Sequence, residues 1–155
     1  MPDLAVINDF MAHKRFAVVG VSQDPKGFAN IVVRELRSAG YDAVPVGAHL
    51  SELDGEPVYA SVAEVPAPVE GVMVMVNPEA AKQVVREAVD AGVPRVWLHQ
   101  GYGRGCVSDE AVAYCREHKV PVVDGACPLM FTEHPQWFHR MHRGMRKMRG
   151  AFRAA

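Results

Sequence analysis

The sequence predicts a doubly wound α/β domain with a mainly parallel five-stranded sheet and helices on both faces. Short apolar runs alternate with amphipathic segments about five times along the chain. This alternation is typical of parallel strands joined by right-handed helical crossovers. The runs are apolar at almost every position, as in strands buried on both faces. No repeat, low-complexity segment or interior linker interrupts the pattern, so we expect one domain over residues 1–155.

Strands are predicted where a continuous apolar run ends in turn-forming residues. The runs with this character are residues 15–21, 42–46, 71–76, 95–99 and 121–124, with a short extended piece at 55–59. The run at 71–76, Gly-Val-Met-Val-Met-Val, is the most apolar of them. The main runs together supply the five strands of the sheet.

Helices are predicted where apolar residues recur every three or four positions behind a capping residue. These segments are residues 3–13, 28–39, 61–64, 77–89 and 108–118, with a last helix within 135–150. Asp3 and Asn77 are expected N-caps, Ser61 begins a capping-box pattern, and Gly40 ends the second helix. The second helix is expected to bury Ile31, Val32, Leu36 and Ala39.

The composition excludes several classes of protein. Hydrophobic residues make up 49% and charged residues 23% of 155 residues, as in a globular domain with its own core. No apolar run reaches the roughly 18–20 residues that span a bilayer, and the acidic N-terminus does not resemble a signal peptide. Three cysteines without C-x-x-C spacing favour a reduced compartment, so we expect a cytoplasmic protein without a membrane partner.

Three loops are candidates for a ligand site, because ligands of open α/β sheets bind beyond the carboxyl ends of the strands. They are residues 20–27, 46–49 and 76–79, all rich in Gly, Ser, Asn or Pro. The first loop leads into a helix at Phe28, and a helix N-terminus favours an anion such as phosphate. Lys26 is placed to meet that phosphate as a point charge. The alternative is that these are ordinary turns and that Lys26 is solvated.

A classical NAD site is disfavoured by two features of these loops. Gly20, Ser22 and Gly27 do not form the G-x-G-x-x-G fingerprint. The second strand ends in Val46-Gly-Ala-His49, without the acid that binds the NAD ribose. An NAD(P)-binding oxidoreductase or redox sensor therefore remains an alternative and not the first hypothesis.

Several short motifs occur in a distinctive order along the chain. They are Gly20-Val-Ser-Gln-Asp-Pro-Lys26, Gly40-Tyr41, Gly55-Glu-Pro-Val-Tyr-Ala-Ser61, Trp97-Leu-His-Gln-Gly101 and Gly125-Ala-Cys-Pro-Leu-Met130. Their order and spacing resemble the small stand-alone CoA-binding proteins, over roughly residues 12–150. Those proteins are single Rossmann-like domains similar to the CoA-binding domain of the succinyl-CoA synthetase α subunit.

The resemblance implies which residues hold coenzyme A. The implied contacts come from the three loops and are Gly20, Val21, Ser22, Gln23, Lys26, Val46, Gly47, Val76, Asn77 and Pro78. One departure is Pro45-Val-Gly-Ala48, where many relatives have Pro-Val-Asn-Pro, so the contact of that Asn is lost. The ligase domains and phosphohistidine segment of the synthetase have no counterpart here. The resemblance therefore implies non-catalytic binding of CoA or an acyl-CoA.

Cys127 is the candidate nucleophile, because it follows the fifth strand near the expected ligand edge. A thiol enzyme using Cys127 is a further hypothesis, which requires a nearby base or helix N-terminus. The simpler interpretation is a small buried apolar side chain. The histidines near the C-terminus, His134, His139 and His142, match no zinc spacing, so no metal is expected.

The C-terminal segment carries an opposite charge from the rest of the chain. Residues 1–133 contain 11 Lys and Arg against 18 Asp and Glu, whereas residues 134–155 contain 6 Lys and Arg and no acid. An apolar stripe runs through Trp137, Met141, Met145 and Met148. We expect a basic helix packed on the sheet or on a second subunit in a homodimer. The alternative is that its cations reach the CoA phosphates; a nucleic-acid partner is not expected.

Overall fold

The computed structural model describes residues 2–100 and 105–132, which contain a five-stranded sheet of strand order β2-β1-β5-β6-β7. The strands are β1 (Arg15–Val19), β2 (Asp42–Val46), β5 (Gly71–Val74), β6 (Val96–His99) and β7 (Val122–Ala126). Every neighbouring pair is parallel. The predicted fold class, a Rossmann-like doubly wound sheet, is confirmed.

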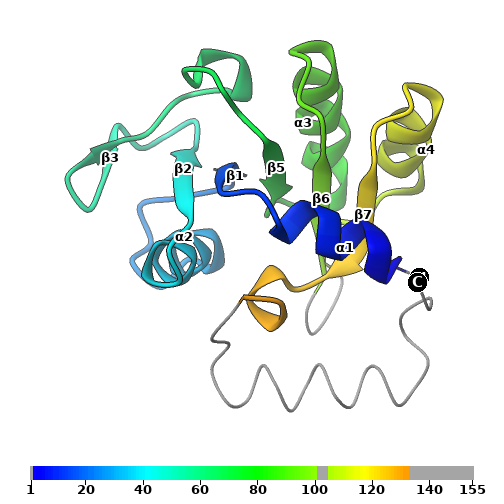
Figure 1. Ribbon diagram of the computed structural model, residues 1–155. Coiled ribbons are helices and arrows are strands. Elements are labelled where there is room, and N and C mark those ends of the chain that lie inside the picture. Colours follow the sequence, from blue (N-terminus) through cyan, green and yellow to red (C-terminus); the bar gives the residue numbers. More distant parts are fainter. Residues whose placement is uncertain (1, 101–104, 133–155) are drawn as a thin grey trace.

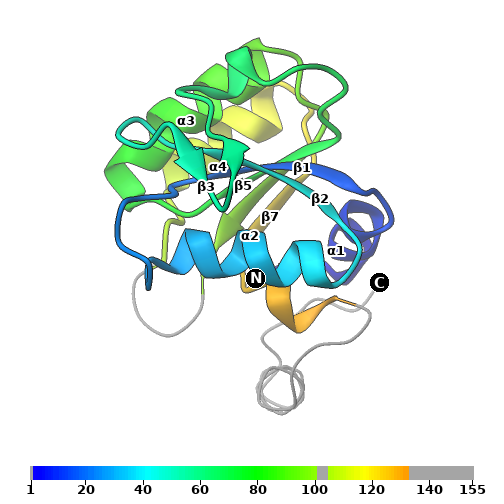
Figure 2. The same ribbon diagram turned by 90° about the vertical axis from the view of Figure 1, so that its left-hand side faces the viewer.

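Helices cover both faces of the sheet (Figures 1 and 2). One face carries α1 (Leu4–Met11) and α2 (Phe28–Ser38), and the other carries α3 (Pro78–Asp90) and α4 (Asp109–Glu117). Alternate residues of β1 pack on opposite sides, with Phe16 beneath α1 and α2 and Ala17 beneath α3 and α4. This explains why the strand is apolar at successive positions and not at alternate ones.

Trp97 of β6 lies at the centre of the core beneath α1. It is fully buried, Phe10 meets it edge-on with ring centroids 5.2 Å apart, and its indole Nε1 donates to the Ala126 carbonyl at 2.8 Å. A side chain at Gly71 would bring a Cβ within 2.6 Å of the Phe10 ring. The glycine that begins β5 is therefore needed for close packing of α1.

The outer edge of β2 is covered by the segment that follows a small hairpin. The hairpin pairs β3 (Glu52–Leu53) with β4 (Glu56–Pro57), and Tyr59 then exchanges backbone hydrogen bonds with Gly47 and Pro45 at 2.9 and 3.1 Å. Pro45 itself has no N–H to expose, and Arg37 Nε donates to the Ala43 carbonyl at 3.1 Å. These contacts pair backbone N–H and C=O groups that an exposed edge strand would leave free to bind another chain and cause aggregation.

Two predicted helix caps are confirmed and one is wrong. Asp3 and Asn77 accept hydrogen bonds from the amides of Ala5 and Ala80, at 2.8 and 2.9 Å. Ser61 makes no such bond, and the segment after it is a short 3₁₀ helix, η1 (Val62–Glu64). A single 3₁₀ turn that ends before Pro66 is too short to support the reciprocal capping box.

Other expectations change in detail. Ile31 was expected to be buried but is 38% exposed, because Val32, Val33 and Leu36 form the inward face of α2. β7 extends to Ala126, two residues beyond the predicted end, and a 3₁₀ helix, η2 (Pro128–Met130), follows it. The last helix, expected within 135–150, lies outside the described residues.

Candidate functional site

The sheet reverses its strand order between β1 and β5, which are neighbours although β2 lies between them in the chain. The helix that follows β1 is α2 and lies on one face, whereas the helix that follows β5 is α3 and lies on the other. The two connections therefore separate at the carboxyl ends of these strands. A crevice between diverging connections is where sheets of this topology bind ligands.

Gly20 joins the first and third candidate loops. Its φ is +121°, and a Cβ there would lie 2.6 Å from the carbonyl oxygen of Met75, which begins the loop after β5. The Met75 amide also donates to the Val19 carbonyl at 2.8 Å. A side chain at residue 20 is excluded both by the backbone conformation and by this close approach.

Gly47 joins the second loop to the first in a similar way. A Cβ on Gly47 would lie 2.5 Å from the Val21 carbonyl oxygen. The Val46 carbonyl accepts from the amides of Gly20 and Val21 at 2.9 and 3.3 Å. Gln23 Nε2 donates to the His49 carbonyl at 3.0 Å. The three loops nominated from the sequence therefore converge.

Asn30 shapes the first loop and was missed at the sequence level. It is 1% exposed, and its Oδ1 accepts from the Ser22 amide at 3.0 Å. Its Nδ2 donates to the carbonyls of Ser22 and Asp24 at 2.8 and 3.0 Å. The sequence could have indicated Asn30 in one way: it is a polar residue next to Ala29, on the same buried face of α2 as Val33. Asn30 holds the loop in a fixed shape, because its side chain pairs with both an amide and two carbonyls of the loop backbone.

The start of α2 differs from the starts of the other described α-helices. The N-caps of α1, α3 and α4 each accept a backbone hydrogen bond with a side chain, whereas the N-cap of α2 is Gly27, with no side-chain bond. The first amides of a helix have no acceptor within the helix, and the helix dipole is positive there. The α2 N-terminus therefore presents unused donors and a positive potential to an anion.

Two side chains lie beside that helix start. A Cβ on Gly27 would come within 2.9 Å of Ser22 Oγ, so the hydroxyl of Ser22 lies against the N-cap. Lys26 is exposed, and its amide donates to Asp24 Oδ1 at 2.9 Å in a local turn. The hydroxyl and the ammonium group are the kinds of side chain that meet a phosphate.

The third loop shapes the candidate site but offers few hydrogen-bond donors to a ligand. The Asn77 Oδ1 is occupied as the α3 cap, and Pro78 has no amide to offer at the first helical position. Val76 is half-buried against the core beneath α3 and lies close to Gly20.

All ten sequence-predicted site residues are thus found on the three converging loops. Several of their amides already donate within the protein, namely those of Gly20, Val21, Ser22, Lys26 and Gly47.

All three cysteines are buried. Burial raises the pKa of Cys106 to about 12, and its Sγ donates to the Val74 carbonyl at 2.8 Å. Burial also raises the pKa of Cys115 to about 11. Cys127 is 4% exposed and is the N-cap of η2. Burial of this kind is typical of cysteines that serve packing.

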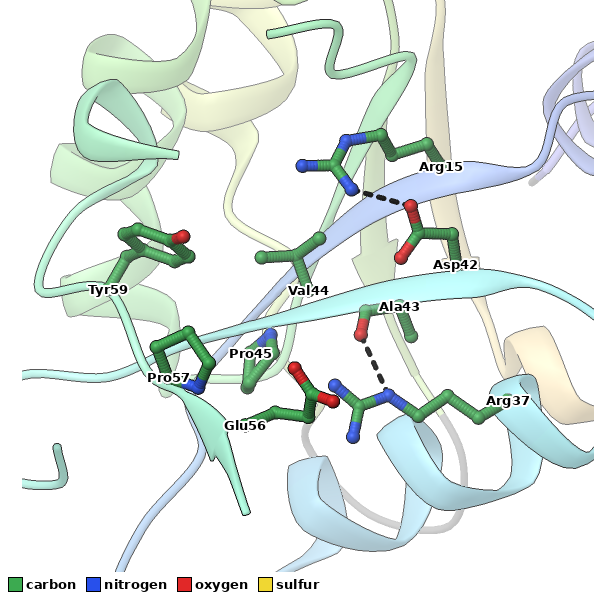
Figure 3. A pocket seen from close by; sticks show the side chains of 9 residues that line it. All are labelled: Arg15, Arg37, Asp42, Ala43, Val44, Pro45, Glu56, Pro57 and Tyr59. Atoms are coloured by element: carbon green, nitrogen blue, oxygen red, sulfur yellow. Dashed lines mark hydrogen bonds and ion pairs between the residues drawn. The ribbon is translucent and has the colours of Figure 1, made fainter. Parts of the chain in front are cut away.

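A separate cavity of about 120 Å³ lies along the outer edge of β2 (Figure 3). Both arginines in its lining already contact other protein groups: Arg15 pairs with Asp42, and Arg37 donates to the Ala43 carbonyl. The volume is below the roughly 300–1,000 Å³ of small-molecule sites. This cavity lies between β2 and the segment that covers its outer edge, and none of its lining residues belongs to the three loops.

Within residues 2–100 and 105–132, no three His, Cys, Asp or Glu side chains come together as metal ligands. His134, His139 and His142 lie outside these ranges, so the expectation of no metal stays a prediction. The same ranges contain no helix that is both long and apolar enough to cross a membrane.

The comparisons with known proteins agree with this geometry. The sequence profile of the CoA binding domain matches residues 14–133. The chain is 29% identical over 127 residues to the uncharacterized protein YneT of Bacillus subtilis, covering 81% of this chain and 91% of YneT. It is 30% identical over 92 residues to the α subunit of an ADP-forming acetate–CoA ligase II of Pyrococcus furiosus, covering 59% of this chain and 20% of that subunit.

A solved structure gives the same result for the fold. A hypothetical protein from Pyrococcus horikoshii superposes with a TM-score of 0.73 at 30% sequence identity, covering 83% of this chain and 87% of that one. The family profile spans most of the chain, including all three loops of the candidate site. The chain therefore belongs to the CoA-binding domain family.

Proposed function

We propose that this protein binds CoA or an acyl-CoA without catalysis, through the loops that follow β1, β2 and β5. The observation that carries the proposal is the uncapped N-terminus of α2, framed by three loops in backbone contact. A pyrophosphate supplies acceptors and negative charge to those donors. Membership of the CoA-binding domain family supports CoA as the pyrophosphate ligand.

The surroundings of the helix start suggest how CoA lies. Its phosphates are proposed to contact the first amides of α2, with Ser22 and Lys26 beside them. The adenosine is proposed to lie toward Val46 and Gly47, because the ribose of a nucleotide lies at the end of the second strand in such folds. The same segment lacks the carboxylate that a dinucleotide site uses for the ribose hydroxyls, which disfavours NAD.

The non-catalytic part of the proposal has its own support. The matched segment is a fifth of the P. furiosus ligase subunit, so ligase activity does not transfer with it. Cys106 and Cys115 have raised pKa values, which suit packing and not nucleophilic attack. We therefore propose that the protein carries, senses or presents the cofactor. A cytoplasmic location stays part of this proposal, supported by three buried cysteines without C-x-x-C spacing.

A charge-reversal pair tests the phosphate contact. Lys26→Glu places a negative charge beside the α2 N-terminus, whereas Lys119→Glu makes the same charge change after α4, at the opposite edge of the sheet. We expect Lys26→Glu to weaken CoA binding about tenfold at low salt and Lys119→Glu to change it less than twofold, measured by calorimetric titration. Equal effects of the two variants would contradict a phosphate site at the start of α2.

A further inference from the structure

Two neighbouring residues of α2 form an apolar patch at the rim of the candidate site. Among the described residues, Phe28 and Ile31 are the exposed large hydrophobic side chains, at 40% and 38%. They are three positions apart in the first turn of α2 and so share one face of the helix.

Phe28 is held in place by a residue from a distant strand. Its ring lies 4.5 Å from the ring of His99, centroid to centroid, with an angle of 30° between the planes. His99 ends β6, whereas Phe28 follows β1, and β5 lies between these two strands in the sheet. The stacked pair therefore spans the carboxyl end of β5, where the third loop begins. The patch thus borders the proposed crevice on its β6 side.

The two sides of the crevice differ in chemistry. The β2 side is lined by backbone and polar groups, including the bond between Gln23 and the His49 carbonyl. The β6 side carries the aromatic pair and Ile31. With the phosphates at the α2 N-terminus and the adenosine toward β2, the rest of the cofactor is directed to the β6 side.

We propose that Phe28 and Ile31, with Phe28 braced on His99, form the contact surface for the pantetheine and acyl part of the ligand. The inference rests on the proposed function and extends it by naming the ligand class: an acyl-CoA with a short apolar acyl group, bound more tightly than free CoA. Burial of each added methylene on such a surface raises affinity by roughly fourfold.

The test compares ligands that share the nucleotide and differ in the arm. The wild-type chain is titrated with adenosine 3′,5′-bisphosphate, CoA, acetyl-CoA and butyryl-CoA, and we expect affinity to rise along this series. Phe28→Ala is expected to lower the affinity for butyryl-CoA about tenfold and to leave adenosine 3′,5′-bisphosphate within twofold. Ile31→Ala is expected to act in the same direction with a smaller loss. Phe28→Leu, which keeps an apolar side chain, is the matched variant and should retain most of the acyl preference.

The outcomes separate this inference from the proposed function. Loss of affinity for all four ligands alike in Phe28→Ala, with unchanged thermal unfolding, would place the adenine on Phe28 and overturn the inference. Unchanged affinity for every ligand would overturn it as well, while CoA binding itself stands. If the wild-type chain binds none of the four ligands, the proposed function fails first.

Discussion

Gln23 donates a hydrogen bond from its side-chain amide to the backbone carbonyl of His49, at 3.0 Å, and so ties the loop after β1 to the loop after β2. The same two loops meet at Gly47, which leaves no room for a side chain against Val21. The loops are therefore held together by contacts within the protein itself. Such preorganisation reduces the entropy lost on binding.

Replacement of Asn30 by Ala should loosen the first loop. The change leaves the Ser22 amide and the carbonyls of Ser22 and Asp24 without their buried partner. We expect a loss of about 2–3 kcal/mol in the free energy of unfolding and a clear loss of CoA affinity. Urea unfolding and titration with CoA measure the two effects. A variant with native stability and native affinity would show that Asn30 does not organise the loop.

Replacement of Gly47 by Ala should weaken CoA binding through the contact between loops. The added Cβ would meet the Val21 carbonyl at 2.5 Å, which forces the second loop away from the first. We expect a loss of about 1–3 kcal/mol in stability together with reduced affinity. Gly55→Ala is the control, because residue 55 has φ +85° but open space around it. It should lose about 1 kcal/mol to backbone strain and keep its affinity for CoA.

Stability should fall in acid partly through Glu70. Its carboxylate accepts from the amides of Arg15 and Lys14, at 2.8 and 3.0 Å, and these bonds hold the pKa of Glu70 below its usual 4.5. A lowered folded-state pKa means that the stabilisation is complete above pH 4.5 and is lost as the pH falls through the folded-state value. Denaturant unfolding between pH 7 and pH 3 should show a shallower loss in Glu70→Gln. Glu64→Gln, at an exposed carboxylate of η1, should follow the wild-type curve, and a Glu70→Gln curve identical to wild type would contradict the assignment.

The thiols should react slowly in the folded protein. With the pKa of Cys106 at about 12, roughly one thiol in 10,000 is ionised at pH 8, and burial blocks access as well. Iodoacetamide labelling followed by peptide mapping should find little modification of the native protein and rapid labelling of all three cysteines in urea. Fast labelling of Cys127 in the native protein below pH 7 would instead support the thiol-enzyme hypothesis.

The parts of the fold that sequence predicted well are those where one local signal dominates. The apolar runs of β1, β2 and β5 are short and rich in Val, which favours strands over helices. Asn77 marks the start of α3 as a capping residue, and Pro78 marks it as a residue without an amide hydrogen. The extended piece predicted at 55–59 contains β4, but β3 and the hairpin pairing were missed because the two strands have two residues each and are mostly polar. Ile31 was wrongly expected inside because helical spacing fits either edge of an apolar face, and only tertiary packing chooses between them.

The candidate site divides in the same way. The three loops were predictable, since topology alone places them at the carboxyl edge of the sheet. The pairing of Phe28 with His99 was not predictable, because the two residues lie far apart in the chain. Asn30 contacts Ser22 and Asp24, which are close to it in the chain, but no sequence pattern shows that its side chain turns back onto the loop. The homodimer, the absence of a nucleic-acid partner and the role of the basic segment 134–155 stay predictions, because that segment lies outside the described residues.

The most direct test of the account is calorimetric titration of the wild-type chain with CoA, acetyl-CoA, NAD and NADP under one buffer condition. CoA and acetyl-CoA are expected to bind saturably, and NAD and NADP are expected to show no measurable binding. Tight binding of NAD together with no binding of CoA would contradict this expectation.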